Sequence, residues 1–481
     1  MTSTSFRQKF DLWVKKVGRH RGNPRLWFDT PRIEQAGLMP GVRFSVTKRG
    51  AGIQIAKDVA GSFTVSSKVR NGKTVPVVDI NNGTDLAVIS EHAVVRIIVQ
   101  ADCVWVLPLA SELAKRERIS RLMGKLARGE PLLSGSLAHG VGVAAHAAHQ
   151  GLGDVGIETT LAFASEIDET YATQSVLHND AAQSASMLVA PMQELVQDQW
   201  VMEQLPKVEL LSLGLPCSGA SVAGKAKNGN KMMESHSEVG HLVYAALALI
   251  QRSQPIALAL ENVVGYQGSA SAEIFRYQLR DMGYHVVEVV LDAQDFGCIE
   301  NRERWFLCAY TDGLECSLET LMPATPPKVP KLGDLLEDVP LDAKCWSPLT
   351  YLRDKETRDA AAGKGFRMQI VNAESTKVPV LRKQYSKGGS TDPFVQHPVN
   401  PDLLRKFTVK EHARIKAIPP ALFEGVSETV GHQMAGQSVA YEQVRALYRE
   451  CIGPAIVRLR DFGATLAGIN AVADRLDAVI G

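Results

Sequence analysis

The chain contains an apolar run, Leu210 to Leu215, that stops abruptly at Pro216 and Cys217. A short continuous apolar run bounded in this way is typical of a buried strand in a parallel sheet. The proline fixes the backbone ahead of the cysteine, and a basic, glycine-containing loop follows. Open α/β sheets bind ligands at the carboxyl ends of their strands. We therefore expect an α/β fold with Cys217 facing a ligand, although a lone Pro-Cys pair more often marks a small buried residue.

Further blocks follow Cys217 in a fixed order. An apolar run ends in Glu261, paired arginines (Arg302 and Arg304) precede another apolar run, and a late Gly-Gln-Ser turn opens a helix. The blocks occupy residues 256–263, 295–310, 405–419 and 435–439. Together with Cys217, they resemble the signature motifs of DNA (cytosine-5) methyltransferases over about residues 133–455. No single motif decides the assignment, but five in the right order are strong evidence for it.

The resemblance implies a fold and a domain order. The fold is α/β, with a Rossmann-like, doubly wound S-adenosylmethionine-dependent methyltransferase sheet that carries a small inserted target-recognition domain. The expected division is an amino-terminal β-rich module and basic connector (1–128), the first part of the catalytic domain (129–312), the target-recognition domain (313–400), and the closing catalytic part with a carboxyl-terminal helix (401–481).

The resemblance also implies four catalytic residues. Cytosine carbon 5 is a poor nucleophile, and a thiolate that adds to carbon 6 activates it by covalent catalysis. Cys217 is the candidate thiolate, and Glu261 is the candidate proton donor at ring nitrogen 3. Arg304 and Arg302 would hold the base and supply the positive charge that a reactive cysteine needs. Taken alone, each residue is more simply explained as a structural or a solvent-exposed side chain. The spacing of all four together favours a catalytic role.

The methyl donor would be S-adenosylmethionine. The segment after Leu132 combines an apolar run with Gly140 and Gly142, which suits close approach of a cofactor to the backbone. A second apolar run ends in Glu166, the expected place for a carboxylate that binds ribose hydroxyls. The cofactor-binding candidates are Gly140, Gly142, Glu166, Ile167, Pro216, Gln437, Ser438 and Val439.

The sequence departs from the family pattern at several positions. Ser136 replaces an acid and Ala138 replaces an aromatic residue that would pack near the adenine. Ser218 and Glu300 each replace a glutamine, and Gln437 replaces an asparagine. These changes bear on donor affinity more than on the chemistry at carbon 5.

Composition is that of a globular enzyme. The 481 residues predict two or three domains, and 45% hydrophobic and 22% charged residues are ordinary values. We expect a cytoplasmic protein, nucleoid-associated in a bacterium, because the sequence has no membrane-length apolar run or signal peptide. Seven cysteines without zinc-ligand spacing favour a reducing compartment, and no metal is implied.

The net charge of +1 does not indicate nucleic acid, so contacts to duplex DNA must be local. A basic run between residues 364 and 387 lies where the family places its recognition domain, and the loop after Cys217 is placed to close over a flipped nucleotide. A charge run is usually a solvated face, but its position in the motif order favours DNA contact. The DNA-binding candidates are Ser221, Lys225, Lys227, Lys364, Arg367, Arg382, Lys383 and Lys387.

Residues 1–128 lie outside the resemblance. Alternating segments and Asn-Gly pairs predict a small β-rich module, faintly similar to the swapped-hairpin domains of bacterial transition-state regulators. A basic helix-like connector follows at 112–128, and an apolar stripe from Ile456 to Val479 predicts a terminal helix. Either the module or this helix would suit a homodimer, and the module would also suit DNA anchoring. We find no internal repeat.

The expected reaction is methyl transfer to carbon 5 of cytosine in duplex DNA through a flipped base. A cognate restriction nuclease is not identified by the sequence. Two alternatives remain open: a tRNA cytosine-5 methyltransferase of the same fold, and a DNA-binding regulator whose donor site has decayed. The substitutions Ser136, Ala138 and Gln437 motivate the second alternative.

Overall fold

The computed structural model of the chain describes residues 9–90, 92–217, 232–319, 321–323 and 327–465. It divides into two compact units, Met1–Arg116 and Glu117–Gly481, each with a hydrophobic core of its own. The division falls inside helix α1 (Ala110–Arg128), which forms the segment predicted as a basic helical connector. Within the described ranges, no helix combines the length and apolar character needed to cross a membrane.

The second unit is built on a seven-stranded sheet with the order β13-β12-β11-β14-β15-β17-β16. The first five strands are parallel, and β17 runs antiparallel between β15 and β16. The first strand of the sheet, β11, lies in its middle, and successive strands are added first on one side of it and then on the other. The order of strands therefore reverses between β11 and β14, at the switch point where open α/β sheets bind ligands. The predicted doubly wound α/β sheet is thus confirmed. The bounds are β11 (Leu132–Leu137), β12 (Thr159–Glu166), β13 (Ser186–Val189), β14 (Leu210–Leu213), β15 (Ala257–Asn262), β16 (Tyr284–Asp292) and β17 (Glu303–Thr311).

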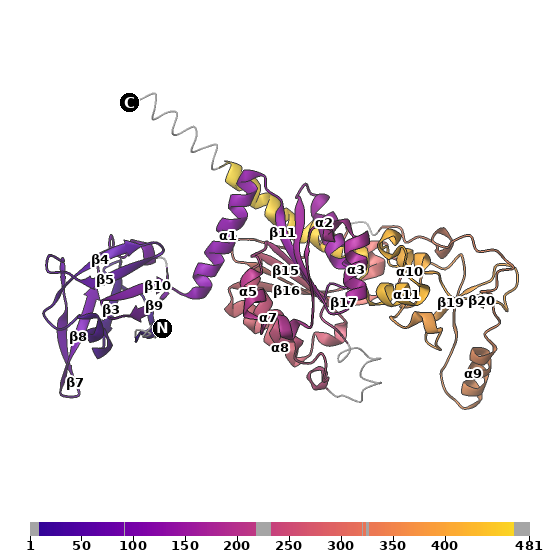
Figure 1. The fold of residues 1–481 in the computed structure, drawn as a ribbon, viewed down its shortest axis with the longest axis horizontal. Helices are drawn as coiled ribbons and strands as arrows, with labels where there is room; N and C mark the ends of the chain where they lie inside the picture. Colours follow the sequence, from indigo (N-terminus) through magenta and orange to yellow (C-terminus); the bar gives the residue numbers. More distant parts are fainter. Residues whose placement is uncertain (1–8, 91, 218–231, 320, 324–326, 466–481) are drawn as a thin grey trace, which may run out of the picture. The chain divides into compact units, whose positions relative to one another are not determined.

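Alternation along the buried strands directs side chains to two cores, one on each face of the sheet. In β14, Leu210 belongs to one core and Leu211 to the other, as the two-residue period of a strand requires. Helices α2 and α12 lie on the first face, and α7 and α8 on the second (Figure 1). The bounds are α2 (Val143–Gly153), α3 (Glu169–His178), α4 (Met192–Leu195), α5 (Gln199–Gln204), α7 (Leu242–Ser253), α8 (Ala270–Asp281) and α12 (Tyr441–Ala446).

Strand β11 depends on a glycine at its centre. A Cβ atom on Gly135 would lie 2.6 Å from the Phe163 ring and 2.8 Å from Leu211. The pairing of β11 with β12 also shifts register between Ser134 and Gly135. Neighbouring side chains therefore fill the space that any other residue would need, and this lets the first strand sit tightly at the switch point.

After β17 the chain leaves the main sheet. Helix α9 (Thr350–Ala361) and a three-stranded sheet, β18 (Gln369–Val371), β19 (Pro393–Gln396) and β20 (Leu404–Arg405), form in the region expected for target recognition. Strand β20 lies just beyond the expected boundary at residue 400. The chain returns through α10 (Val409–Ile415) and α11 (Glu428–Gln437), then α12 and a π-helical turn, Leu447–Ile452.

The terminal helix is present over residues 453–465. Its apolar stripe begins with the buried Ile456 and continues to Phe462, which is exposed. The remaining predicted positions of the stripe, from residue 466 onward, lie outside the described residues, so a dimer interface there remains a prediction.

The first unit is β-rich, as the sequence predicts, with a six-stranded and a four-stranded sheet. Two segments share one order of elements: a hairpin, a 3₁₀ turn and a second hairpin. The first has β2 (Gly18–His20), β3 (Asn23–Asp29), η1 (Pro31–Ala36), β4 (Arg43–Arg49) and β5 (Gly52–Lys57). The second has β7 (Ser66–Arg70), β8 (Lys73–Ile80), η2 (Ala87–Ile89), β9 (Val94–Val99) and β10 (Cys103–Pro108). Strands β1 (Asp11–Lys16) and β6 (Phe63–Thr64) extend the larger sheet.

These two segments pair with each other symmetrically. Strand β3 pairs antiparallel with β8, and β5 pairs antiparallel with β10. In the pairing of β5 with β10, Ile53 lies opposite Val106 and Ile55 lies opposite Val104. Rotating the pair of strands by half a turn places each of these two contacts on the other. The expectation of no internal repeat is therefore wrong at the level of structure. Side-chain identity has diverged while the order of elements and the buried β-branched positions have not.

Candidate active site

Cys217 follows β14 at the switch point of the sheet. The backbone of the loop between them is held from both neighbouring strands, since Gly214 donates to the carbonyl of Leu137 and the side-chain amide of Asn262 donates to that of Leu215. The Asn262 contact measures 3.0 Å and is buried. The sequence places Asn262 beside Glu261 without assigning it a role, and the structure shows that it fixes the approach to Cys217.

Glu261 and Arg304 form an ion pair next to this loop. Because β17 is antiparallel to β15, its first residues lie at the same edge of the sheet as the last residues of β15. The Nε atom of Arg304 lies 2.9 Å from Oε1 of Glu261, and the two side chains are only 13% and 16% exposed. The N–H does not point at that oxygen, so Oε1 has no hydrogen-bond donor among the described residues. This carboxylate oxygen is thus buried beside Arg304 with its hydrogen-bonding capacity unused.

The charges of this pair act on Cys217 in opposite directions. Burial raises the pKa of the Cys217 thiol above its ordinary value, and the Glu261 carboxylate raises it further. The guanidinium groups of Arg304 and Arg302 lower it. Since the raising causes prevail, the surroundings of Cys217 favour the thiol over the thiolate.

Arg302 belongs to a buried charge cluster. Its Nη2 donates to the carbonyl of Ser438 at 3.0 Å, and its Nη1 lies 3.7 Å from Oε1 of Glu300. Glu300 also lies 3.3 Å from the ammonium of Lys416 and accepts from the backbone N–H of Leu381 at 2.9 Å. Glu300 and Lys416 are fully buried.

Burial and the adjacent Arg302 lower the pKa of Lys416 to about 7, against the opposing effect of Glu300. Sequence reasoning missed Lys416. The available signal was the acid at Glu300, where the family has a neutral glutamine, because a buried acid needs a buried partner.

The predicted donor-site residues come together at the ends of β11 and β12. The Glu166 carboxylate accepts backbone N–H groups from Gly140 at 2.6 Å, and from Ile167 and Asp168 at 3.0 Å. Gly140 and Gly142 both have positive φ, and no atom lies within 4 Å of a Cβ built on Gly140. At Gly142, by contrast, a Cβ would lie 2.3 Å from Asn179 and 2.5 Å from His139, so the backbone is open at Gly140 only.

The closing block lies against the same region. The Gln437 side-chain amide donates to the hydroxyl of Tyr171 on α3 at 2.8 Å, while Ser438 offers its carbonyl to Arg302. Val439 is buried, and Pro216 precedes Cys217 across the switch point. The hydrogen bond between Arg302 and Ser438 therefore connects the charge cluster to the predicted donor residues.

The site's chemistry fits a nucleoside-type donor. Glu166 is a buried carboxylate with two oxygens at the end of β12, suited to hydroxyl donors. Beside it, the apolar side chain of Ile167 is 67% exposed, a surface that a flat base could cover. The open turn at Gly140 leaves room for a ligand against the main chain. An aromatic residue at Ala138 would add to this surface and is missing.

The predicted DNA-binding residues fall into three groups. Ser221, Lys225 and Lys227 lie outside the described residues. Lys364, Arg367, Lys383 and Lys387 are exposed in the recognition region. Arg382 differs, because its guanidinium binds the buried carboxylate of Asp392 at 2.8 Å, and a Cβ on Gly436 of α11 would lie 2.4 Å from its backbone. Arg382 therefore has a structural role besides any contact with DNA.

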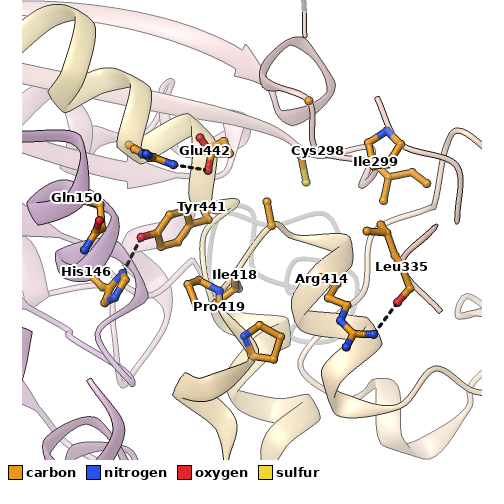
Figure 2. A pocket seen from close by; sticks show the side chains of 15 residues that line it. His146, Gln150, Cys298, Ile299, Leu335, Arg414, Ile418, Pro419, Tyr441 and Glu442 are labelled. Atoms are coloured by element: carbon orange, nitrogen blue, oxygen red, sulfur yellow. Dashed lines mark hydrogen bonds and ion pairs between the residues drawn. The ribbon is translucent and has the colours of Figure 1, made fainter. Parts of the chain in front are cut away.

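A cavity of about 610 Å³ lies elsewhere in this unit, between α2, α10 and α12 (Figure 2). Tyr441 accepts or donates a hydrogen bond with His146 at its wall, and Arg414 donates to the carbonyl of Leu335. None of the predicted catalytic or donor residues lines it. The cavity is therefore separate from the site at the switch point.

Comparison with known proteins identifies the family. The model of the C-5 cytosine-specific DNA methylase family matches residues 136–453. The chain belongs to this family. It is a DNA cytosine-5 methyltransferase, and the match lies within the second unit, leaving the first unit outside. The resemblance drawn from the sequence over about residues 133–455 is confirmed.

Relatives and solved structures agree with this assignment. The chain is 30% identical to the Type II methyltransferase M.NlaX of Neisseria lactamica over 293 residues, which are 59% of this chain and 86% of that protein. It is 28% identical to M.SsoII of Shigella sonnei over 256 residues, 52% of this chain and 65% of that one. The S. pombe Dnmt2 methyltransferase structure superposes with a TM-score of 0.53 at 18% identity, over 69% of this chain and 99% of that chain, and shows a shared fold.

Proposed function

We propose that this methyltransferase transfers a methyl group from S-adenosylmethionine to carbon 5 of cytosine in duplex DNA through a covalent adduct with Cys217. The observation that supports this most is the Glu261–Arg304 ion pair beside Cys217 at the switch point. A nucleophile, a proton donor and a cation are the three groups that addition to a cytosine ring requires.

Cys217 attacks carbon 6 as the thiolate, so a sulfur–carbon bond forms and the ring's 5,6 double bond opens. Glu261 in its protonated form hydrogen-bonds ring nitrogen 3 and relieves the charge that develops there. Carbon 5 then acts as an enamine carbon and takes the methyl group, and the donor's sulfur leaves as a neutral thioether. Transfer of the carbon 5 proton to solvent and departure of the thiolate restore the double bond and the free cysteine.

The thiol must lose its proton before attack. Arg304 favours the thiolate, but in this state its charge is balanced by Glu261. A cytosine that engages Glu261, with the carboxylate protonated, would leave the Arg304 charge uncompensated beside Cys217. The pKa of the thiol would then fall when the substrate is in place, and this couples activation to binding.

The target base must leave the helix to reach this site. Carbon 6 of a stacked base is inaccessible to a side chain, and extrusion costs a few kcal/mol. The exposed cations of the recognition region, Lys364, Arg367, Lys383 and Lys387, are placed on the segment expected to hold the flanking duplex. Phosphate contacts of this kind position a protein on DNA without reading its sequence.

When bound, S-adenosylmethionine supplies an electrophilic methyl group on a sulfonium. Glu166 would bind its ribose hydroxyls, and Ile167 would cover its base. The open position at Gly140 would let it approach the main chain, while Pro216 and the 437–439 turn would line the rest of the donor site. Glu166 would have to exchange some of its three backbone N–H partners for ligand hydroxyls.

The relatives' names support a biological context. Several are Type II methyltransferases, as in Neisseria lactamica and Haemophilus parainfluenzae. We propose modification of DNA within a restriction-modification system as the role of this chain.

A mechanism-based trap tests the chemistry. A duplex containing 5-fluorocytosine should capture the protein covalently in the presence of S-adenosylmethionine, because elimination needs a proton that fluorine replaces. Peptide mass spectrometry should place the adduct on Cys217, and Cys217→Ala should form none while retaining DNA affinity. An adduct on another cysteine would refute the assignment.

Cys345, which is exposed, provides a matched control. Cys345→Ala should trap as efficiently as the wild type. Calorimetry with S-adenosylmethionine separates the enzyme from a regulator with a decayed donor site, because such a regulator would bind no donor and form no trapped complex.

A further inference from the structure

The two units carry opposite net charges. Residues 1–116 contain 18 lysines and arginines against 9 acidic residues, a net charge of +9. The remaining residues contain 35 against 43, a net charge of −8. The whole-chain value of +1 hides this separation. A polyanion such as DNA would therefore be attracted to the unit that lies outside the methylase match.

Part of this charge lies on two exposed hairpin arms. Arm A is the β2–β3 hairpin, which turns at Arg21 and Gly22, and arm B is the β7–β8 hairpin, which turns at Asn71 and Gly72. All four turn residues have positive φ. Strands β2 and β7 are exposed along their whole length and form the two edges of the four-stranded sheet. Figure 1 shows arm B projecting from the module.

Each arm presents cations without acidic partners. Arg19 and Arg21 lie on arm A, and Arg70 and Lys73 lie on arm B. All four are exposed, and none forms an ion pair with another residue in the described ranges. By contrast, Arg25 at the base of arm A is paired with Asp79. Cations without acidic partners at the tips are available to phosphates.

The arms are related by the approximate half-turn that exchanges the two segments, and they point in opposite directions along the sheet. Strand β3 pairs with β8 only from Leu26 to Asp29, and each arm extends beyond this overlap. Extending the register places Gly22 and Gly72 twelve residues apart along the strands. At about 3.3 Å per residue this is roughly 40 Å for untwisted strands. One turn of duplex DNA repeats at about 34–36 Å.

We propose that the first unit is a second DNA-binding surface, in which arms A and B contact the phosphate backbone about one helical turn apart. This proposal rests on duplex DNA being the substrate of the chain. The arms contribute affinity that does not depend on sequence, because arginine and lysine contacts to phosphates carry no base information. They hold the acidic catalytic unit on DNA.

Salt titrations of the full-length protein test the arms. The probe is a 30-base-pair duplex of A·T pairs, which contains no cytosine and cannot enter the catalytic site as substrate. Arg19→Gln with Arg21→Gln removes the arm A cations, and Arg70→Gln with Lys73→Gln removes those of arm B. Each pair should reduce the slope of log affinity against log salt by about 2, at roughly 0.9 per lost phosphate contact.

The matched control is Lys48→Gln with Arg49→Gln at the β4–β5 turn. It removes the same charge from the same unit at exposed positions on a hairpin of the six-stranded sheet, which contains neither arm. Its slope should equal that of the wild type. Equal slopes for all three double variants and the wild type, or an equal loss in the control, would overturn the proposal. Circular dichroism checks that each variant is folded.

The results of these titrations can be distinguished from a failure of the proposed methyl-transfer reaction. Both arm variants should still form the 5-fluorocytosine adduct when the duplex is saturating, since Cys217 is untouched. Loss of trapping in the wild type would refute the reaction, whereas normal trapping with unchanged salt slopes would refute only the arms. An arm defect seen on single-stranded RNA and absent on the A·T duplex would also overturn the proposal.

Discussion

Around Cys217, one carboxylate and one guanidinium control the state of the nucleophile. Glu261 raises the pKa of the Cys217 thiol and Arg304 lowers it, although both are expected to serve the same reaction. Chemical reactivity of the free enzyme and catalytic activity should therefore respond differently to substitution at these positions. This separation distinguishes a catalytic role from general damage to the site.

Glu261→Gln should make Cys217 react faster with iodoacetamide at pH 8, because removing the carboxylate lowers the thiol pKa. The same change should slow methyl transfer by about 10²–10⁴-fold, since the proton donor is lost. Arg304→Gln should slow both reactions. Alkylation is followed at the Cys217 peptide by mass spectrometry, and wild-type alkylation rates in both variants would contradict the assigned electrostatics.

The sequence predicted the residue types at this site but not their partners. Cys217, Glu261 and Arg304 could be found because each follows or precedes an apolar run that ends at the same edge of a sheet. Lys416 could not be found, because its meaning depends on Glu300, which is over a hundred residues away and pairs with it only through the fold. Arg382 was expected to contact DNA, and its binding to Asp392 likewise depends on tertiary structure.

Among the elements, β11 carries the tightest constraint. It is the first strand of the doubly wound sheet and forms one side of the switch point. At Gly135 the Phe163 ring and Leu211 occupy the space of a side chain from both neighbouring strands. The position of β11 between β12 and β14 therefore depends on a residue that no catalytic motif includes.

Gly135→Ala should lower the free energy of unfolding by about 1–3 kcal/mol, because the new methyl group overpacks the sheet. Gly153→Ala is the matched control. It lies at the end of α2 with open space around its Cβ position, so the change should be neutral or stabilising by at most about 1 kcal/mol. Urea unfolding measures both, and equal values for the two variants would contradict the packing argument.

Among the elements, the sequence predicted several buried strands and the doubly wound class of the sheet, but not every relation between strands. Buried runs such as β14 and β15 are continuous and apolar, so they are readable. The repeat in the first unit is not readable from the sequence, because equivalent positions of its two segments, such as Ile53 and Val104, share only β-branched character. The symmetric pairing of strands is visible in the backbone even though the side chains of the two segments differ.

Over the whole molecule, the two units differ in core, charge and family. The first has its own apolar cluster, which includes Leu26, Ile53 and Val104, and the methylase match begins beyond it. The second contains every predicted catalytic and donor residue. The two units should therefore unfold in separate transitions, and a ligand of one unit should raise the unfolding midpoint of that unit.

Differential scanning calorimetry of the full chain should show two transitions. S-adenosylmethionine at 100 times its Kd should stabilise the catalytic unit by about 2.7 kcal/mol and raise one midpoint only. The A·T duplex should raise the other midpoint, and the arm variants should abolish that shift. A single transition that both ligands move together would show that the units unfold as one cooperative body.

The internal half-turn of the first unit has a consequence for how the chain finds DNA at low abundance. Twofold-related DNA contacts usually come from two separate subunits, so the active species becomes scarce when the protein is dilute. Here both halves lie on one polypeptide and are present in equal number in every molecule. Occupancy of a DNA site would therefore scale with the first power of protein concentration. In a cell that holds only a few copies, no active species would be lost through separation of subunits.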